Sequence, residues 1–213
     1  MEDEAEARAM VDAVGSGWLV TTGPDGVPVA TLLPILWRGD RVVAHLAKAN
    51  HHWQGITDDD PALVIVGGPE AYVSPSWYPS KADGGRAVPT WNYTAVHLTG
   101  TVRVHHDAAW LRDAVTDLTD RHEAGRAERW RVTDAPAGYV DARLRGIVGI
   151  EVQVGRVEAK AKLSQNKDDA DRRGVVDGLR REGDPQATAI AAAMAADSTA
   201  GSAAGDDGGP GRR

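Results

Sequence analysis

Short strand-like segments separated by strong turn signals are the feature that most constrains the fold of this chain. Six segments rich in apolar and β-branched residues occur, at residues 18–22, 27–37, 41–47, 62–66, 90–105 and 147–162. Gly-Pro-Asp-Gly at 23–26 and Arg-Gly-Asp at 38–40 are turn sequences between such segments. Six strands joined by tight turns predict a closed or nearly closed antiparallel barrel.

Amphipathic stretches predict helices beside these strands. The main candidates cover residues 2–14, 51–57, 108–123 and 167–181. Asp107 can cap the third of them, and Ser164 or Asn166 can cap the fourth. We therefore expect a mainly β domain with flanking helices.

The C-terminal part of the chain has a different composition. Residues 187–196 are rich in Ala and favour a last helix, whereas the residues from about 198 onwards are mostly Gly, Ala, Asp and Pro. We expect one domain over residues 1–183, followed by a largely disordered tail over residues 184–213.

The composition excludes several kinds of protein. The chain has no cysteine, which excludes disulfides, thiolate metal sites and a cysteine nucleophile. The net charge is −7, and residues 1–120 alone carry −8, which disfavours non-specific binding to duplex DNA. No segment has the roughly 18 consecutive apolar residues of a membrane span, and the acidic start is no signal peptide. We expect a cytoplasmic protein.

A segment rich in both aromatic and polar residues indicates a ligand site. Residues 71–81 and 88–100 contain Tyr72, Trp77, Tyr78, Trp91 and Tyr93, together with Lys81, Asn92 and His97. Each buried Trp or Tyr brings a polar tip that needs a partner, so a packed core does not require this mixture. Flat rings beside fixed polar groups suit a planar, polar ligand. The alternative is a proline-rich loop whose aromatic side chains cover a sheet edge.

Two strand ends carry polar residues that suit an anion or another polar ligand. Residues 45–53 run from a strand into a helix start, where Lys48, Asn50 and His52 would add donors to the free N–H groups of the helix. Residues 160–167 place three lysines, a Ser, a Gln and an Asn at another strand end. In both places, a capped helix with solvated polar residues is the alternative interpretation.

Several common metal-binding, catalytic and nucleotide-binding motifs are missing from the sequence. The adjacent histidines at 51–52 and 105–106 point in different directions on a strand or helix, and there is no HExxH motif, so no metal site is predicted. The sequence has no G-x-S-x-G elbow, G-x-G-x-x-G or Walker motif, which disfavours an α/β-hydrolase, a Rossmann site and a P-loop.

Six motifs together resemble the PaiB family, described as FMN-binding negative transcriptional regulators. They are HLAKANHHW at 45–53, GPEAYVSPSWYPSK at 68–81, VPTWNYTAVHLTG at 88–100, LTDRHE at 118–123, LRGIVGIEV at 144–152 and KLSQNK at 162–167. This family resembles the wider FMN-binding split barrels, which are homodimers with flavin at the subunit interface. The resemblance therefore implies a six-stranded antiparallel split β-barrel of the FMN-binding type, a homodimer, and FMN as the cofactor.

The resemblance also implies which residues bind the cofactor, although it identifies no catalytic residue. Lys48, Asn50 and His52 correspond to the FMN phosphate site, and Thr31, Leu32 and Leu33 to the strand along the flavin ring. The aromatic segment contributes further predicted cofactor-binding residues, which are Trp77, Tyr78, Trp91, Asn92 and Tyr93. The K-L-S-Q-N loop is expected near the flavin ring or the partner subunit of the dimer, and it contributes Lys162, Ser164 and Asn166.

Three functions remain open on the sequence. The family name implies a dimeric FMN-bound transcriptional regulator, but no helix-turn-helix with a basic recognition helix is found, which disfavours direct DNA binding. The second function is an FMN-dependent oxidoreductase or oxidase acting on a small molecule. The third is a barrel that holds haem or another planar cofactor through one of seven histidines. Neither a substrate nor an operator follows from the sequence.

Overall fold

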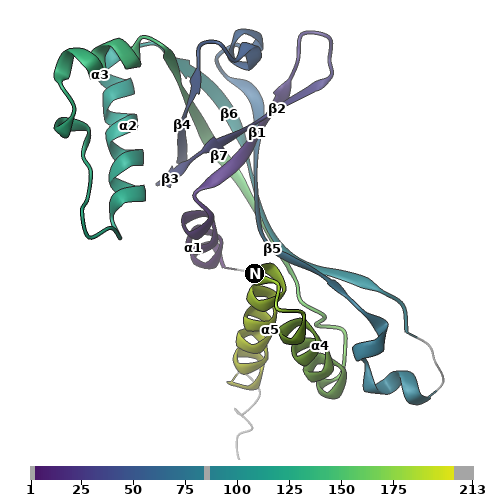
Figure 1. The fold of residues 1–213 in the computed structure, drawn as a ribbon. Helices are drawn as coiled ribbons and strands as arrows, with labels where there is room; N and C mark the ends of the chain where they lie inside the picture. The colour runs from purple at the N-terminus through teal and green to yellow at the C-terminus, as the bar shows by residue number, and fades with distance from the viewer. Residues whose placement is uncertain (1–2, 84–86, 204–213) are drawn as a thin grey trace, which may run out of the picture. The chain divides into compact units, whose positions relative to one another are not determined.

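The computed structural model describes residues 3–83 and 87–203, and a sheet of seven strands dominates this part of the chain (Figure 1). The strand order is β2-β1-β5-β6-β7-β4-β3. The strands are β1 (Ser16–Thr22), β2 (Pro28–Pro34), β3 (Leu36–Arg38), β4 (Arg41–Ala47), β5 (Asp60–Val73), β6 (Thr90–His105) and β7 (Ile147–Lys162).

The expectation of six strands is corrected to seven, because the segment 27–37 forms two strands rather than one. Pro34 has no N–H to donate to a strand ladder, and the N–H of Ile35 donates to the carbonyl of Gly15 at 3.0 Å. β2 pairs with β1, and β3 pairs with β4, so they lie at opposite ends of the strand order. Only Ile35 separates these two end strands along the chain, and the sheet must therefore curl round into a barrel.

The chain divides into two compact units, and this division differs from the expected domain at 1–183 and tail at 184–213. Met1–Gly67 and Val96–Ala159 form the barrel unit, whereas Gly68–Ala95 and Lys160–Arg213 form the second unit. The helix α5 (Pro185–Ala203) lies within the expected tail, and its residues Ile190, Ala191 and Met194 are fully buried. Residues 204–213 of the expected tail lie outside the described residues.

Alternating side chains and capped helices build the barrel unit. Val42, Ala44 and Leu46 alternate along β4 and are buried, which is the pattern of a strand with one face in the core. The helices of this unit are α1 (Glu4–Val14), η1 (His51–Gly55), α2 (Ala108–Glu123), η4 (Val132–Asp134) and α3 (Ala137–Leu144). Asp107 caps α2 as predicted, because its carboxylate accepts the N–H of Trp110 at 2.8 Å.

The second unit packs two helices and two short turns around its own core. These elements are η2 (Pro75–Trp77), η3 (Pro79–Asp83), α4 (Asp169–Glu182) and α5. Asp168, rather than Ser164 or Asn166, caps α4, since its carboxylate accepts the N–H of Asp171 at 2.8 Å. Among the described helices of both units, none is long and apolar enough to span a membrane.

Candidate functional site

A buried histidine joins three segments of the barrel unit. The Nε2 atom of His52 lies 2.9 Å from Oγ1 of Thr21 on β1, and its Nδ1 atom lies 2.8 Å from Oγ1 of Thr31 on β2. Burial lowers the pKa of His52, which favours the neutral ring with one N–H donor and one acceptor. Both ring nitrogens are therefore occupied, and His52 serves to hold the loop rather than to offer a donor to a phosphate.

The loop before η1 is fixed by further hydrogen bonds and leaves Lys48 exposed. Asn50 Oδ1 accepts the N–H of His52 at 3.0 Å, and Asn50 Nδ2 lies 3.4 Å from Thr31 Oγ1. The N–H of Lys48 donates to the Gly146 carbonyl at 2.8 Å, and no ion pair of its side chain occurs within residues 3–83 and 87–203. The helix expected over 51–57 is only the five-residue 3₁₀ turn η1, so side-chain donors are what this loop offers to an anion.

The three predicted residues of β2 alternate between two faces, with Thr31 and Leu33 on the inner face and Leu32 on the outer face. Leu33 is 5% exposed and packs in the barrel core, so its side chain is not available to a ligand. Leu32 points outward, is 52% exposed, and lies opposite Trp18 of β1, which is 49% exposed. β2 is an end strand of the sheet order, so one of its edges carries no ladder hydrogen bonds from another strand in the described part of the chain.

A cavity of about 490 Å³ lies beside His52 in the barrel unit. Its lining residues are Thr21, Thr22, Gly23, Pro24, Val29, His51, His52, Gln54 and Gly55. Of the residues predicted from the sequence, only His52 lines this cavity. Thr21 was not predicted, although a hydroxyl at an inward position of β1 is the kind of signal that indicates a buried hydrogen bond.

Asn92 and Ser164 contact each other in the interior of the second unit. The Asn92 amide nitrogen donates to Ser164 Oγ at 3.0 Å, and the Ser164 hydroxyl lies 3.2 Å from Asn92 Oδ1. Both side chains are buried, and Ser164 adopts a left-handed backbone conformation with φ of 59°. These two predicted ligand residues therefore fix the conformation of the loop, and their polar groups are already satisfied.

Trp77 is a packing residue of the second unit. A Cβ atom added at Gly178 of α4 would lie 2.2 Å from the Trp77 ring, so the ring covers this glycine directly. A Cβ atom added at Gly174, one turn earlier, would lie 2.1 Å from the carbonyl oxygen of Trp77. Trp77 is thus held against α4 and does not present a free face for stacking on that side.

The remaining predicted aromatic residues have separate surroundings. Trp91 is half exposed and donates through Nε1 to Glu70 at 3.2 Å. Lys160 Nζ lies 5.7 Å from the centre of the Tyr93 ring. Tyr78 is 3% exposed, and Lys167 Nζ lies 4.8 Å from the centre of its ring.

A second cavity, of about 410 Å³, contains five of the predicted residues. Its lining consists of Tyr78, Val88, Pro89, Thr90, Asn92, Lys162, Ser164, Gln165, Asn166 and Lys167. The predicted site residues thus fall into two groups: six belong to the barrel unit and eight to the second unit. Within each of these two groups, the structure places several of the predicted residues in contact with one another.

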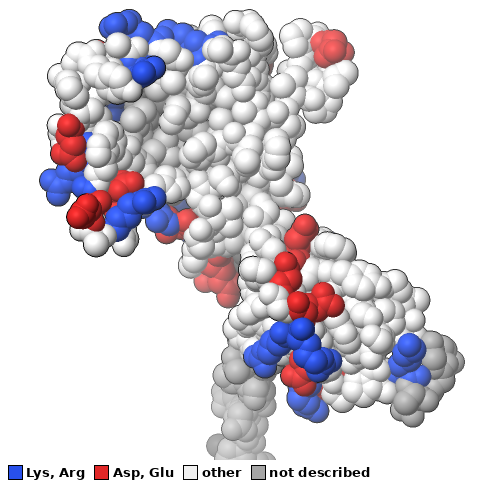
Figure 2. All heavy atoms as spheres, in the orientation of Figure 1, with Lys and Arg blue, Asp and Glu red and all other residues white. Residues whose placement is uncertain are grey.

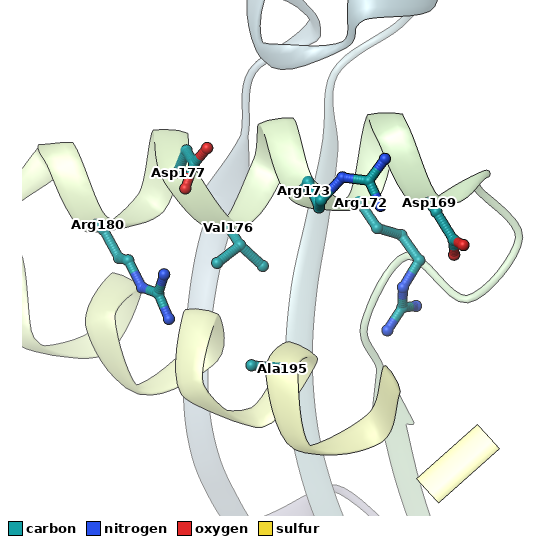
Figure 3. A pocket seen from close by; sticks show the side chains of 7 residues that line it. All are labelled: Asp169, Arg172, Arg173, Val176, Asp177, Arg180 and Ala195. Carbon is teal, nitrogen blue, oxygen red and sulfur yellow. The ribbon is translucent and has the colours of Figure 1, made fainter. Parts of the chain in front are cut away.

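A groove between α4 and α5 contains three arginines but has mixed charge (Figure 3). Arg172, Arg173 and Arg180 line it together with Asp169 and Asp177. Arg172 is buried and binds the carbonyls of Leu163 and Met194, at 3.1 and 3.2 Å. Basic and acidic side chains also lie side by side over α4 in Figure 2. This groove therefore offers a less selective environment for an anion than the cavity beside Lys162 and Lys167.

The described residues contain no group of three or more histidine, aspartate or glutamate side chains arranged to hold a metal ion. The half-buried His45 and His105 also have pKa values lowered by burial. His105 stacks on Trp110 with 4.1 Å between the ring centres. These two histidines belong to the packing between the sheet and α2 and are not part of either cavity.

Comparison with known proteins decides the family. Residues 1–156 match the family described as "Putative FMN-binding domain". The chain belongs to this family. It is also 32% identical over 182 residues to the "Protease synthase and sporulation protein PAI 2" of Bacillus subtilis (strain 168), an alignment that covers 84% of each chain. The predicted resemblance to the PaiB family and the prediction of FMN as the cofactor are confirmed.

Solved structures confirm the fold of this FMN-binding family member. The FAD and heme binding protein from Mycobacterium smegmatis matches with a TM-score of 0.60 and 20% identity, over 84% of this chain and 79% of that one. The flavocytochrome Anf3 from Azotobacter vinelandii matches with a TM-score of 0.56 and 18% identity, over 81% and 74%. At these identities the likeness concerns the fold, which is the predicted split barrel with flanking helices.

The donors of the barrel unit fit FMN. Lys48 supplies a cation, and Asn50 supplies an amide in the same loop. The flavin ring carries hydrogen-bonding groups on its edge, and the unpaired edge of β2 offers backbone partners for such groups. The residues present are therefore compatible with the family's cofactor, with His52 as support for the loop.

Proposed function

We propose that this chain is a homodimeric, FMN-dependent regulatory protein of the PaiB kind, which binds FMN through β2 and the loop Lys48–Asn50 of the barrel unit. The observation that carries the proposal is the hydrogen-bonded group of His52, Thr31 and Asn50, which holds this loop against β2. When bound, FMN supplies the capacity for hydride or electron transfer. The protein supplies the binding site and its electrostatics.

Lys48 is the proposed contact of the FMN phosphate. It is the only lysine or arginine between Arg41 and Lys81, in a part of the chain that is otherwise acidic. Since His52 is neutral and internally bonded, the positive charge in this loop comes from Lys48 alone. A phosphate with up to two negative charges would gain most from this side chain.

The experiment on Lys48 compares FMN with riboflavin, which has the same ring and no phosphate. A charge-assisted hydrogen bond is worth about 1.5–3 kcal/mol, which is about ten- to a hundredfold in Kd. We expect Lys48→Ala to weaken FMN by this factor and to leave riboflavin nearly unchanged, as measured by flavin fluorescence titration. Equal weakening of both flavins would mean that Lys48 has a structural role and that the phosphate binds elsewhere.

The proposed dimer rests on an exposed apolar surface of the barrel unit. Trp18 and Leu32 lie opposite each other on β1 and β2, and both are about half exposed. On the face shown in Figure 2, the surface over these two strands is almost free of charged side chains. Exposed apolar patches of this kind are typical of interfaces, so a second copy of the chain would cover the patch and place the flavin beside it.

The dimer proposal is tested by light scattering with a matched pair of variants. We expect a dimer for the wild type and a shift towards monomer, with weaker FMN binding, for Trp18→Glu. Trp130→Glu is the control, because Trp130 is equally exposed, at 47%, and lies away from β1 and β2 in sequence and pairing. A monomeric wild type with bound FMN would contradict the proposal.

The regulatory role is separated from enzymatic activity by one assay. An FMN-dependent oxidoreductase would consume NADH or NADPH with a suitable acceptor, whereas a regulator would bind FMN without such turnover. We expect binding without turnover, and an effect on transcripts that is lost in a Lys48→Ala strain. Because the net charge of −7 disfavours direct binding to DNA, we expect this effect to be indirect. We also propose that the protein acts in the cytoplasm.

A further inference from the structure

The cavity of about 410 Å³ in the second unit has a positive lining that the flavin proposal does not use. Its lining includes Lys162 and Lys167, and it contains no Asp or Glu. In a chain with a net charge of −7, such a cavity is a local concentration of positive charge. Its volume lies at the lower end of the range of ligand pockets, which favours a small ligand.

The two lysines keep unused hydrogen-bonding capacity. Lys162 Nζ donates to Thr90 Oγ1 at 2.7 Å, which occupies one of its three N–H groups. Lys167 Nζ lies over the Tyr78 ring. Neither ammonium group forms an ion pair with any residue in the described ranges 3–83 and 87–203. Two partly buried, unneutralised cations that line one cavity attract an anion more strongly than exposed ones, because the solvent screens them less.

The same cavity is lined by Tyr78, whose side chain carries a buried hydroxyl. Tyr78 is almost completely buried, and its hydroxyl has no hydrogen-bond partner among the residues that the structure describes. Buried polar groups are normally paired, so an orphaned one indicates a missing partner. Burial, with the charge of Asp171 as a second cause, raises the pKa of Tyr78 and keeps the hydroxyl protonated as a donor. A bound anion would be a suitable acceptor.

The loop between the two lysines is held in a conformation that costs free energy. Ser164 has a φ of 59°, a left-handed backbone conformation that non-glycine residues rarely adopt because it is unfavourable for them. The buried Asn92 amide compensates by bonding the Ser164 hydroxyl across 72 residues of sequence. Strained backbone that is fixed in this way concentrates at functional sites, and here it places Lys162 and Lys167 on one cavity.

We infer that this cavity binds a small ligand through an oxyanion, a phosphate or a carboxylate group, and that this ligand is not the flavin. Lys162, Lys167 and the Tyr78 hydroxyl are the donors, and Val88 and Pro89 provide an apolar wall. The distinction from the flavin rests on the proposed function, in which Lys48 binds the only phosphate of FMN. The inference that the cavity binds an oxyanion does not depend on the proposed function.

The test is a titration of the purified, flavin-free full chain with inorganic phosphate and, separately, with benzoate, followed by calorimetry at constant ionic strength. We expect saturable binding, and the tighter probe identifies the oxyanion that the site prefers. Lys162→Gln and Lys167→Gln should each weaken it about tenfold or more, and Tyr78→Phe about two- to tenfold. Lys160→Gln is the matched control, because Lys160 precedes Lys162 by two residues and does not line the cavity.

A melting temperature is measured for each variant, so that a loss of fold is not mistaken for a loss of binding. Absence of saturable binding of both probes to the wild type would overturn the inference. Equal weakening by Lys160→Gln would also overturn it, because general surface charge would then explain the binding. Tyr78→Phe leaves the ring in the core, so it provides a test even where a lysine variant is unstable.

The same titration with FMN-saturated protein decides whether the ligand is separate from the flavin. Unchanged phosphate binding, with unchanged FMN affinity in Lys162→Gln, would support a separate ligand. Competition between phosphate and FMN would show that the cavity holds the flavin phosphate, and so would weaker binding of FMN, but not of riboflavin, to Lys162→Gln. Either result would overturn the inference that the ligand is not the flavin. A chain that binds no FMN at all would contradict the proposed function and leave the phosphate titration decisive for this cavity.

Discussion

Replacing His52 by alanine should destabilise the barrel unit far more than the same replacement at the neighbouring His51. His52 is buried and bonds through both ring nitrogens to Thr21 and Thr31, whereas His51 is exposed and has one long contact with Gln54 at 3.3 Å. The two variants remove the same side chain from adjacent positions. They therefore separate the buried hydrogen bonds from the general effect of losing a histidine.

The expected magnitude follows from the groups that are left behind. His52→Ala removes two hydrogen bonds of about 1 kcal/mol each and leaves the buried Thr21 hydroxyl without its partner, for a total of about 2–4 kcal/mol. For a chain of this length, this corresponds to a decrease in melting temperature of about 5–15 °C. His51→Ala should stay within about 0.5 kcal/mol of the wild type, as is usual for exposed positions.

The assay is urea denaturation followed by circular dichroism, together with FMN titration of each variant. Loss of the His52 contacts also frees the loop that carries Lys48, so His52→Ala should weaken FMN in addition to lowering stability. Similar stabilities of the two variants would refute the argument, because the ring of His52 would then contribute nothing beyond that of His51.

The pH dependence provides a second check on the same residue. Burial lowers the pKa of His52 in the folded state, so the unfolded chain binds the proton more readily. The stabilisation is complete above the unfolded value of about 6.5 and is lost as the pH falls through the folded pKa. His52→Ala lacks this term, so the difference in stability between wild type and variant should be smaller at pH 5 than at pH 8. A constant difference would mean that the ring is not buried as a neutral group.

Three further predictions concern the fold and its pH dependence. Gly178→Ala should lower the melting temperature, because overpacking against Trp77 costs about 1–3 kcal/mol and exceeds the gain in helix propensity of about 1 kcal/mol. Gly138→Ala is the control and should be neutral or stabilising, because a Cβ atom added at Gly138 meets nothing within 4 Å. Truncation after residue 184 should expose the core of the second unit and increase dye binding, whereas deletion of residues 204–213 should leave melting and FMN binding unchanged. His45→Gln and His105→Gln should each reduce the loss of stability between pH 7 and pH 5, since burial lowers both pKa values and the stability they contribute is lost on acidification.

Local pattern was sufficient to predict many elements of this protein. Turn sequences and apolar alternation located the strands, because these signals depend on neighbouring residues only. The cap of α2 at Asp107 was predicted for the same reason. The motifs that resemble the PaiB family, such as the segment from His45 to Trp53, also predicted the split barrel and FMN.

The tertiary structure decided which of the predicted residues are free to contact a ligand. Leu33 faces the core, the nitrogens of His52 are taken by two threonines, and Asn92 is paired with Ser164, which is 72 residues away. The division of one expected strand at Ile35 depends equally on distant partners, because β2 pairs with β1 whereas β3 pairs with β4. The physical reason is the same in each case: burial and hydrogen-bond pairing are set by contacts between residues distant in sequence, and local periodicity carries no information about them.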